Sequence, residues 1–432
     1  MPRNPGSIPA LERARKGATL TRWQWLIRLL SRKMWFRAAL VCAFGGALAL
    51  AGALVGHTIS YDFAAKIGSK SVDNILTILA SSMLAVTTFS LTAMVSTYSG
   101  ATCTLTPRAV QLLIDDSTAQ NTLATFLGSF LFAIVGSIAL STGLYGETGR
   151  VILFFGTIVV ILFIVFTLLR WIEHIARFGR VADTIDRVER AALAAVDTIA
   201  MPLALDARPD GLPPRGMIAI CPETVARVTH VDIALLGEIA KAVDADIHIL
   251  ALPGKLVEPE LPIALVARAC DDDRIARIRS AFTLSHHRAF DHDPRFGLIV
   301  LSEIASRALS PAVNDPGTAI AVIEAGARVL RRIVDHQADV PSLPARVHVP
   351  AIHLADLLED WCRPIARDGA ATIEVGIRLQ KALGALAGHA EDARPLIRRE
   401  AQDAVERAKA ALTSGADRAA IERAYASCFG QG

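Results

Sequence analysis

The sequence predicts an α-helical membrane domain with four transmembrane helices, followed by a cytosolic, mixed α/β, helix-rich C-terminal domain. The chain of 432 residues is 52% hydrophobic and only 20% charged. Its mean hydropathy of +0.41 is higher than that of ordinary soluble proteins. Long apolar runs occur before residue 171 and not after it. Because a helix crosses the hydrocarbon core with about 20 apolar residues, the first part of the chain is predicted to span a membrane.

Residues 1–35 form a basic and aromatic segment ahead of the first apolar run. Arginine and lysine alternate there with Trp23, Trp25, Leu26 and Trp35. This mixture favours an interfacial helix on the anionic cytoplasmic leaflet. We therefore expect the segment to lie beside the bilayer.

The transmembrane domain is expected over residues 36–170, with spans at about 39–56, 72–97, 122–144 and 151–170. The first span is rich in glycine and alanine, which suits close helix packing. No convincing cleavage site follows it, so we expect it to be retained. The fourth span is the most apolar and is expected to face lipid.

The distribution of basic residues predicts the orientation. Nine Lys/Arg residues precede the first span, and five lie within residues 170–190. The loop between the first and second spans contains Lys66 and Lys70, and the turn between the third and fourth spans contains Arg150. Because cytoplasmic flanks are enriched in Lys and Arg, both termini are expected in the cytoplasm. The predicted location is the bacterial cytoplasmic (inner) membrane, with the lipid bilayer as a partner.

A cytosolic helical extension is expected over residues 171–202, because apolar residues continue at helical spacing beyond the fourth span. It is predicted to be one long helix that projects from the membrane. A stretch rich in proline, glycine and aspartate (204–216) then marks a boundary. A cytosolic α/β domain is expected over residues 203–432, with strands near 217–221 and 246–252 and helices near 231–243, 271–284, 294–309 and 316–334.

Polar side chains in the second span gather on one helical face. At 100° per residue they occupy an arc of about 140°; they are Asp73, Asn74, Thr77, Ser81, Thr88, Thr92 and Ser96. Hydroxyls of this kind can support close packing between membrane helices. They can also line a water-filled path assembled from several copies of the chain. Both interpretations stay open.

The string SPAVNDPG at residues 310–317 contains a helix stop and a helix start. Pro311 ends one helix, and Asp315 with Pro316 matches an N-cap followed by proline at the first helical position. One interpretation is a corner whose polar groups satisfy the backbone. The other makes Ser310, Asn314 and Asp315 a ligand or subunit contact.

Two strings carry a resemblance to a known family. RFGLIVLSEIASRALSPAVNDPGTAI, preceded by LSHHRAFDHD, and TFSLTAMVSTYSG with Thr106-Pro107-Arg108 resemble a bacterial family of predicted membrane proteins, domain-of-unknown-function family 2254. The resemblance covers roughly residues 30–410. It implies four membrane helices and a cytosolic C-terminal domain, and it implies no activity.

No pattern in the chain predicts an enzyme, a metal site or a cofactor. His287 and Asp291 would share a helical face, but the string HHRAFDHD lacks a metal-ligand pattern and is expected to be a solvated loop. The six cysteines are scattered without Cys-x-x-Cys, so neither a disulfide framework nor a zinc site is predicted. The net charge of +3 does not indicate a nucleic-acid partner.

Two functions remain. The first is a homo-oligomeric channel or transport pore, lined by the polar second span and assembled or gated by the cytosolic domain. Asp73 and Asn74 would lie at its outer mouth and favour monovalent cations. The alternative is a membrane-anchored cytosolic sensor or interaction module that conducts nothing.

Overall fold

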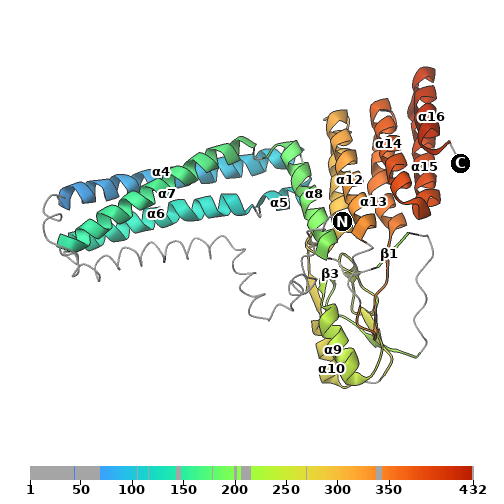
Figure 1. The fold of residues 1–432 in the computed structure, drawn as a ribbon, viewed down its shortest axis with the longest axis horizontal. Helices are drawn as coiled ribbons and strands as arrows, with labels where there is room; N and C mark the ends of the chain where they lie inside the picture. The colour runs from blue at the N-terminus through green and yellow to red at the C-terminus, as the bar shows by residue number, and fades with distance from the viewer. Residues whose placement is uncertain are drawn as a thin grey trace, which may run out of the picture. The chain divides into compact units, whose positions relative to one another are not determined.

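The computed structural model describes residues 69–430, except 105, 115, 143–146, 178, 199–201, 206–215, 269 and 337–342, together with Ala43. The described residues form two compact units (Figure 1). One contains residues 69–100 and 113–179, and the other contains 101–112 and 180–430. The connection between two membrane helices therefore belongs to the same compact unit as the C-terminal part of the chain.

Three helices of the first unit are long and apolar enough to cross a membrane: α4 (Ser69–Thr104), α6 (Ser117–Ser141) and α7 (Glu147–Arg177). They correspond to the second, third and fourth predicted spans. The third begins five residues earlier than predicted, because Asp116 caps α6 by accepting a hydrogen bond from the Ala119 N–H. The predicted span 39–56 and the segment 1–35 lie outside the described residues.

Helix α6 is the most enclosed of the three. In its apolar stretch 56% of the residues are buried, against 22% in α4 and in α7. A Cβ on Gly136 of α6 would lie 3.3 Å from Leu76 of α4 and 3.3 Å from Leu153 of α7. The small residue therefore marks the point where the three helices approach closely.

Buried polar contacts also join these helices. The Trp171 indole N–H of α7 donates to Ser90 Oγ of α4 at 3.0 Å, and both side chains are buried. His174 Nε2 of α7 lies 3.3 Å from Oδ1 of Asp116, the residue that caps α6. Because unpaired polar groups are costly in an apolar environment, these contacts fix how α4, α6 and α7 pack.

The expectation of one continuous helix after the last span is wrong. Helix α7 ends at Arg177, and a new helix, α8 (Val181–Thr198), begins four residues later. Gly179 between them has a φ of +81°, the left-handed conformation that commonly ends a helix. A Cβ there would lie 2.4 Å from Thr97 Cγ2 of α4. Apolar spacing continues through this position, so periodicity alone did not reveal the break.

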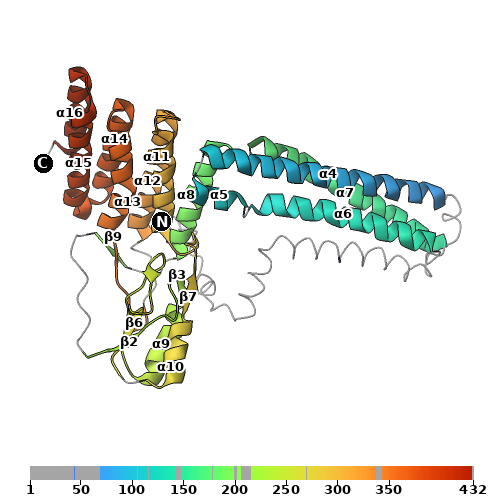
Figure 2. The same cartoon turned by 180° about the vertical axis from the view of Figure 1, so that it is seen from behind.

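The second unit is dominated by an array of helices. Each helix packs on helices one or two places away in the chain, and α8 packs on α11 and α12. Figures 1 and 2 show the successive helices side by side, from α11 and α12 to α15 and α16. They are α11 (Pro294–Ala308), α12 (Pro316–His336), α13 (Leu354–Asp368), α14 (Ile373–His389), α15 (Arg394–Ala411) and α16 (Gly415–Phe429), with a 3₁₀ turn at Glu391–Ala393.

Close contacts at small residues hold this array. Gly326 of α12 lies against the fully buried Trp361 of α13, where a Cβ would be 2.0 Å from the indole nitrogen. Gly297 of α11 meets Ala192 of α8 in the same way, with a Cβ position 2.4 Å from Ala192 Cβ. Arg328 of α12 makes two 2.6 Å bonds to Glu189 of α8.

The strands of the second unit form three small sheets. The orders are β2-β6-β4-β8, β5-β3-β7 and β1-β9. Helices α9 (Ile233–Val243) and α10 (Asp272–Ser280) belong to this part. The strands are β1 (Leu203–Ala204), β2 (Ile218–Ile220), β3 (Ala226–Val231), β4 (Ile247–Ile249), β5 (Leu256–Val257), β6 (Ala264–Val266), β7 (Phe282–Ser285), β8 (Val347–His348) and β9 (Ile352–His353).

An apolar core closes the β part. It includes Ile220 of β2, Ile247 of β4, Val228 of β3, Phe282 of β7 and Leu236 of α9, so two of the sheets share it. The predicted strands near 217–221 and 246–252 and the helices near 231–243, 294–309 and 316–334 are confirmed within a few residues. The helix expected over 271–284 is too long, since α10 ends at Ser280 and the chain continues into β7.

Candidate functional site

The predicted polar stripe lies on the face of α4 that the described residues leave exposed. Its hydroxyl members Thr77, Ser81, Thr88, Thr92 and Ser96 are all exposed. The opposite face is buried, and it contains Val72, Leu76, Leu79, Met83, Ser90 and Met94. These five hydroxyl side chains therefore do not contribute to the packing of α4 on α6 and α7.

Three of the five stripe hydroxyls donate their protons within α4 itself. Ser81 donates to the Thr77 carbonyl at 3.1 Å and to the Ile78 carbonyl at 3.0 Å. Thr88 donates to the Leu84 carbonyl, and Thr92 to the Thr88 carbonyl, each at 2.9 Å. A hydroxyl has one donor and two acceptor sites, so what remains on these three side chains is acceptor oxygen.

Asp73 and Asn74 occupy different surroundings. Asp73 is half-buried and accepts a 2.7 Å hydrogen bond from the Ser137 hydroxyl of α6, whereas Asn74 is exposed. Asp73 lies at the edge of the stripe and joins α4 to α6, so the exposed line begins at Asn74. Sequence periodicity placed Asp73 within the arc and could not show this partner.

The residues Ser310, Asn314 and Asp315 form a tight corner between α11 and α12. Ser310 Oγ donates to the Arg307 carbonyl at 2.7 Å, and its own carbonyl accepts from the Asn314 N–H at 2.9 Å. Asn314 has a φ of +48°. Asp315 caps α12 by accepting from the Thr318 N–H at 3.1 Å and from its hydroxyl at 2.6 Å. The predicted cap is confirmed; the proposed ligand or subunit contact stays a prediction.

The string HHRAFDHD does more than form a solvated loop. His286 and His287 are exposed, but Asp293 is buried and caps α11 through the Phe296 N–H at 3.0 Å. Among the residues that the structure describes, no group of three His, Cys, Asp or Glu side chains could hold a metal ion. The string instead supplies part of the wall of a cavity.

We name this space the inner cavity. It has a volume of about 500 Å³ and lies within the second unit. Three stretches of chain line it: residues 250–255 after β4, residues 288–299 at the start of α11, and residues 350–360 at the start of α13. Its ionisable lining residues are Lys255, Arg288, His292, Asp293, Arg295, His353, Asp356 and Asp360.

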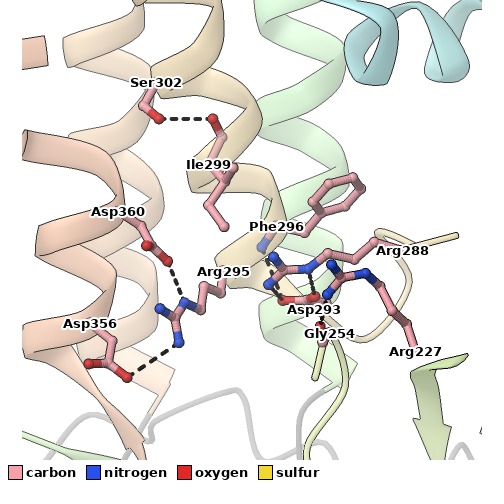
Figure 3. Close-up of polar contacts among 10 residues, drawn as sticks. All are labelled: Arg227, Gly254, Arg288, Asp293, Arg295, Phe296, Ile299, Ser302, Asp356 and Asp360. Carbon is pink, nitrogen blue, oxygen red and sulfur yellow. Dashed lines mark hydrogen bonds and ion pairs between the residues drawn. The ribbon is translucent and has the colours of Figure 1, made fainter. Parts of the chain in front are cut away.

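A buried ion pair forms one wall of the inner cavity (Figure 3). Arg288 Nε and Nη2 lie 2.5 and 3.2 Å from the two carboxylate oxygens of Asp293. Burial raises the pKa of the Asp293 carboxyl, while the hydrogen bond and charge of Arg288 oppose that shift. Arg288 also stacks over the Phe296 ring at 5.2 Å. These contacts fix the first turn of α11.

Gly254 is required beside this pair. It has a φ of +91°, and a Cβ would lie 2.2 Å from Asp293 Oδ2 and 2.7 Å from Arg288 Nη2. Its N–H donates to the Val228 carbonyl at 2.8 Å, and its carbonyl accepts from Arg227 Nη1 at 2.9 Å. The Pro253-Gly254 turn therefore holds the β part against α11.

A second set of charged contacts on this wall joins α11 to α13. Arg295 of α11 pairs with Asp360 of α13 and lies 3.3 Å from Asp356 (Figure 3). Asp360 and Ile299 line the inner cavity and also a second, more open cavity of about 880 Å³. The two cavities thus share a wall made by α11 and α13.

We name this second space the arginine cavity. Four arginines line it, together with three acids and the start of α5 (Pro107–Ile114); the charged residues are Arg108, Arg307, Arg363, Arg367, Glu303, Glu359 and Asp360. Arg108 pairs with Glu303 of α11, and burial raises the Glu303 pKa against the effect of Arg108. Sequence reasoning missed both cavities, since the walls of the arginine cavity come from segments as far apart in the chain as Thr106 and Arg367.

A family model described as "Predicted membrane protein (DUF2254)" matches residues 31–385. The chain belongs to this family. The resemblance seen in the sequence is confirmed, and the protein is a predicted membrane protein with apolar helices and a helix-rich remainder. No curated protein and no solved structure matches the chain.

Proposed function

We propose that the protein is a homo-oligomeric channel or transport pore of the bacterial inner membrane, lined by α4. The observation that carries the proposal is the exposed polar line of this helix, opposite its packed face. Asn74, Ser81 and Thr88 are spaced by seven residues, with Thr92 on the same line. A repeat of seven suits helices that supercoil around a shared axis.

Apolar side chains beside this line supply a contact between copies. Leu84, Leu91 and Val95 lie on one side of it and Ile78 and Phe89 on the other, and they are 46–71% exposed. One chain has too few spans to enclose a path, whereas several α4 helices packed through these residues would surround one. The hydroxyl oxygens would then face the axis.

The hydrogen bonds of the stripe favour cations. Because Ser81, Thr88 and Thr92 spend their protons on α4 carbonyls, a ring of such side chains offers oxygen acceptors that can replace water around a cation. Monovalent cations are the expected permeants, because an ion with a single charge gives up its hydration water more readily than one with a higher charge.

The four-span arrangement and the orientation belong to the same proposal. The predicted span 39–56 precedes α4, and basic flanks place both termini in the cytoplasm. Residues 101–112 share a compact unit with residues 180–430. Two spans separate residues 101–112 from residues 180–430, so both segments must lie on the same side of the membrane. In the proposed orientation that side is the cytoplasm. The proposal assigns no enzymatic activity.

The test is ion flux and single-channel recording on the full chain in liposomes. The variant S81L/T88L/T92L should lose conductance while keeping its oligomeric state. Thr167 of α7 makes the same kind of hydroxyl-to-carbonyl bond, to Phe163 at 2.8 Å. T167L should therefore conduct normally. A wild-type protein that is silent across voltage, pH and common ions would refute the proposal.

The inner cavity favours a second function, a membrane-anchored sensor or interaction module. A concave space of about 500 Å³ lies in the size range of small-molecule sites. The corner at Ser310, Asn314 and Asp315, in which Asn314 and Asp315 are exposed, would then be a ligand or subunit contact. Suppose that the chain conducts no ions in liposomes but its cytosolic part still binds a ligand or a second subunit. That result would support this function over the pore.

A further inference from the structure

The inner cavity carries charges of both signs in equal number. Besides histidines, its lining includes three basic side chains and three carboxylates; they are Lys255, Arg288, Arg295, Asp293, Asp356 and Asp360. Arg288 and Asp293 neutralise each other in their buried pair. Arg295 contacts both Asp356 and Asp360, so this group of three keeps one negative charge in excess. Lys255 supplies the balancing positive charge from another stretch of the chain.

The two unbalanced charges keep hydrogen-bonding capacity. Lys255 Nζ donates to the Leu250 carbonyl at 2.8 Å, and an ammonium group has two further protons to donate. Asp356 lies 3.3 Å from Arg295 Nη1, and its side chain is 51% exposed. Because a carboxylate has about four acceptor positions, Asp356 can accept further donors. Each of the two side chains can therefore bind a ligand group of the opposite charge.

These charges come from different sides of the cavity. Asp356 of α13 lies on one side of Arg295, and Gly254 lies on the other (Figure 3). Lys255 follows Gly254 in the turn after β4. Each of the three lining stretches also contributes an aliphatic side chain; these are Leu252, Ile299 and Ile352. A ligand that satisfies both charges therefore needs an anionic end, a cationic end and an apolar stem.

We propose that the inner cavity binds a small aliphatic zwitterion, in which a short hydrocarbon chain joins a carboxylate to an ammonium group. The carboxylate would accept the remaining protons of Lys255, and the ammonium group would donate to Asp356. Charge-assisted hydrogen bonds of this kind are stronger than neutral ones. The volume of about 500 Å³ suits a ligand of this size. The proposal rests on the second function, ligand binding by the cytosolic part, and does not depend on conduction.

The test is isothermal titration calorimetry of the full-length protein in detergent, with 6-aminohexanoate as the probe. Two analogues separate its charges, because hexanoate lacks the ammonium group and hexylamine lacks the carboxylate. Loss of one charged hydrogen-bonding group should weaken binding by about tenfold or more. 6-Aminohexanoate should therefore bind at least that much more tightly than either analogue.

Two substitutions assign the two ends of the ligand. K255M should weaken binding of 6-aminohexanoate by about tenfold and should not weaken binding of hexylamine. D356N should weaken binding of 6-aminohexanoate by a similar factor and should not weaken binding of hexanoate. K241M on α9 and D392N in the 3₁₀ turn remove the same charges from exposed positions outside the cavity. Both control variants should bind the probe like the wild type.

Three results would overturn the proposal. An analogue that binds as tightly as 6-aminohexanoate would refute the zwitterion but leave the cavity as a ligand site, so the second function would survive. Equal losses in K255M, D356N and the control variants would place the binding outside the cavity. No binding of any of the three compounds at millimolar concentration would refute the zwitterion and the second function together.

Discussion

Replacing Gly254 with alanine should open the start of α11, and the structure allows its cost to be divided into two parts. The first is the backbone: an L-residue in the left-handed region costs about 1–2 kcal/mol. The second is steric, because the new Cβ would lie 2.2 Å from Asp293 Oδ2. Asp293 cannot move away without separating from Arg288, and breaking a buried pair costs about 3–5 kcal/mol.

A second glycine isolates the backbone part. Gly216 has a φ of +86°, close to the +91° of Gly254, but no atom lies within 4 Å of its Cβ position. G216A should therefore lower the free energy of unfolding by only about 1–2 kcal/mol. G254A should lower it by about 4 kcal/mol or more. The difference between the two variants measures the contact with the ion pair.

The assay is hydrogen exchange of the full-length protein in detergent, followed by mass spectrometry. The Phe296 amide bonds to Asp293 Oδ1, so its protection should fall sharply in G254A and stay near the wild-type value in G216A. Similar protection of the Phe296 amide in the two variants would refute the reasoning, since Asp293 would then have shifted without loss of its contacts.

Two other predictions concern the helical array. G326A places a methyl group 2.0 Å from the buried Trp361 indole and should destabilise the second unit by about 3 kcal/mol in thermal unfolding. G388A, in open space on α14, should not. Hydrogen bonds from Thr318 lower the pKa of Asp315 below its ordinary value of 3.8, so the cap stabilises α12 above that pH and loses its effect as pH falls below it. The protection of amides at the α12 N-terminus, relative to their unfolded exchange rates at the same pH, should therefore fall below about pH 4. D315N, which keeps a capping oxygen, should remove that dependence; an unchanged profile in D315N would contradict the assignment.

Some features were readable from local sequence because local chemistry determines them. Apolar length alone identifies the segments that became α4, α6 and α7. The cap at Asp315 followed by Pro316 needs only the dihedral preferences of adjacent residues. The polar face of α4 follows from helical periodicity, and its exposed position confirms that the arc points away from the packed face.

Other features depend on contacts between residues that come together only when the chain folds. The break at Gly179 depends on the contact with Thr97 of another helix as well as on glycine, and apolar spacing on both sides conceals it. The ion pair of Asp293 with Arg288 looked like part of a polar loop, because burial is what makes it structural.

The sequence by itself determined that this is a membrane protein of family 2254 with a polar face on its second predicted span. Hydropathy and periodicity are properties of consecutive residues, so no partner is needed to recognise them. The tertiary structure alone decided where the cavities lie. Arg108 and Glu303 are 195 residues apart, and charges on distant helices carry no mark of their pairing until the packing of apolar faces brings them within reach.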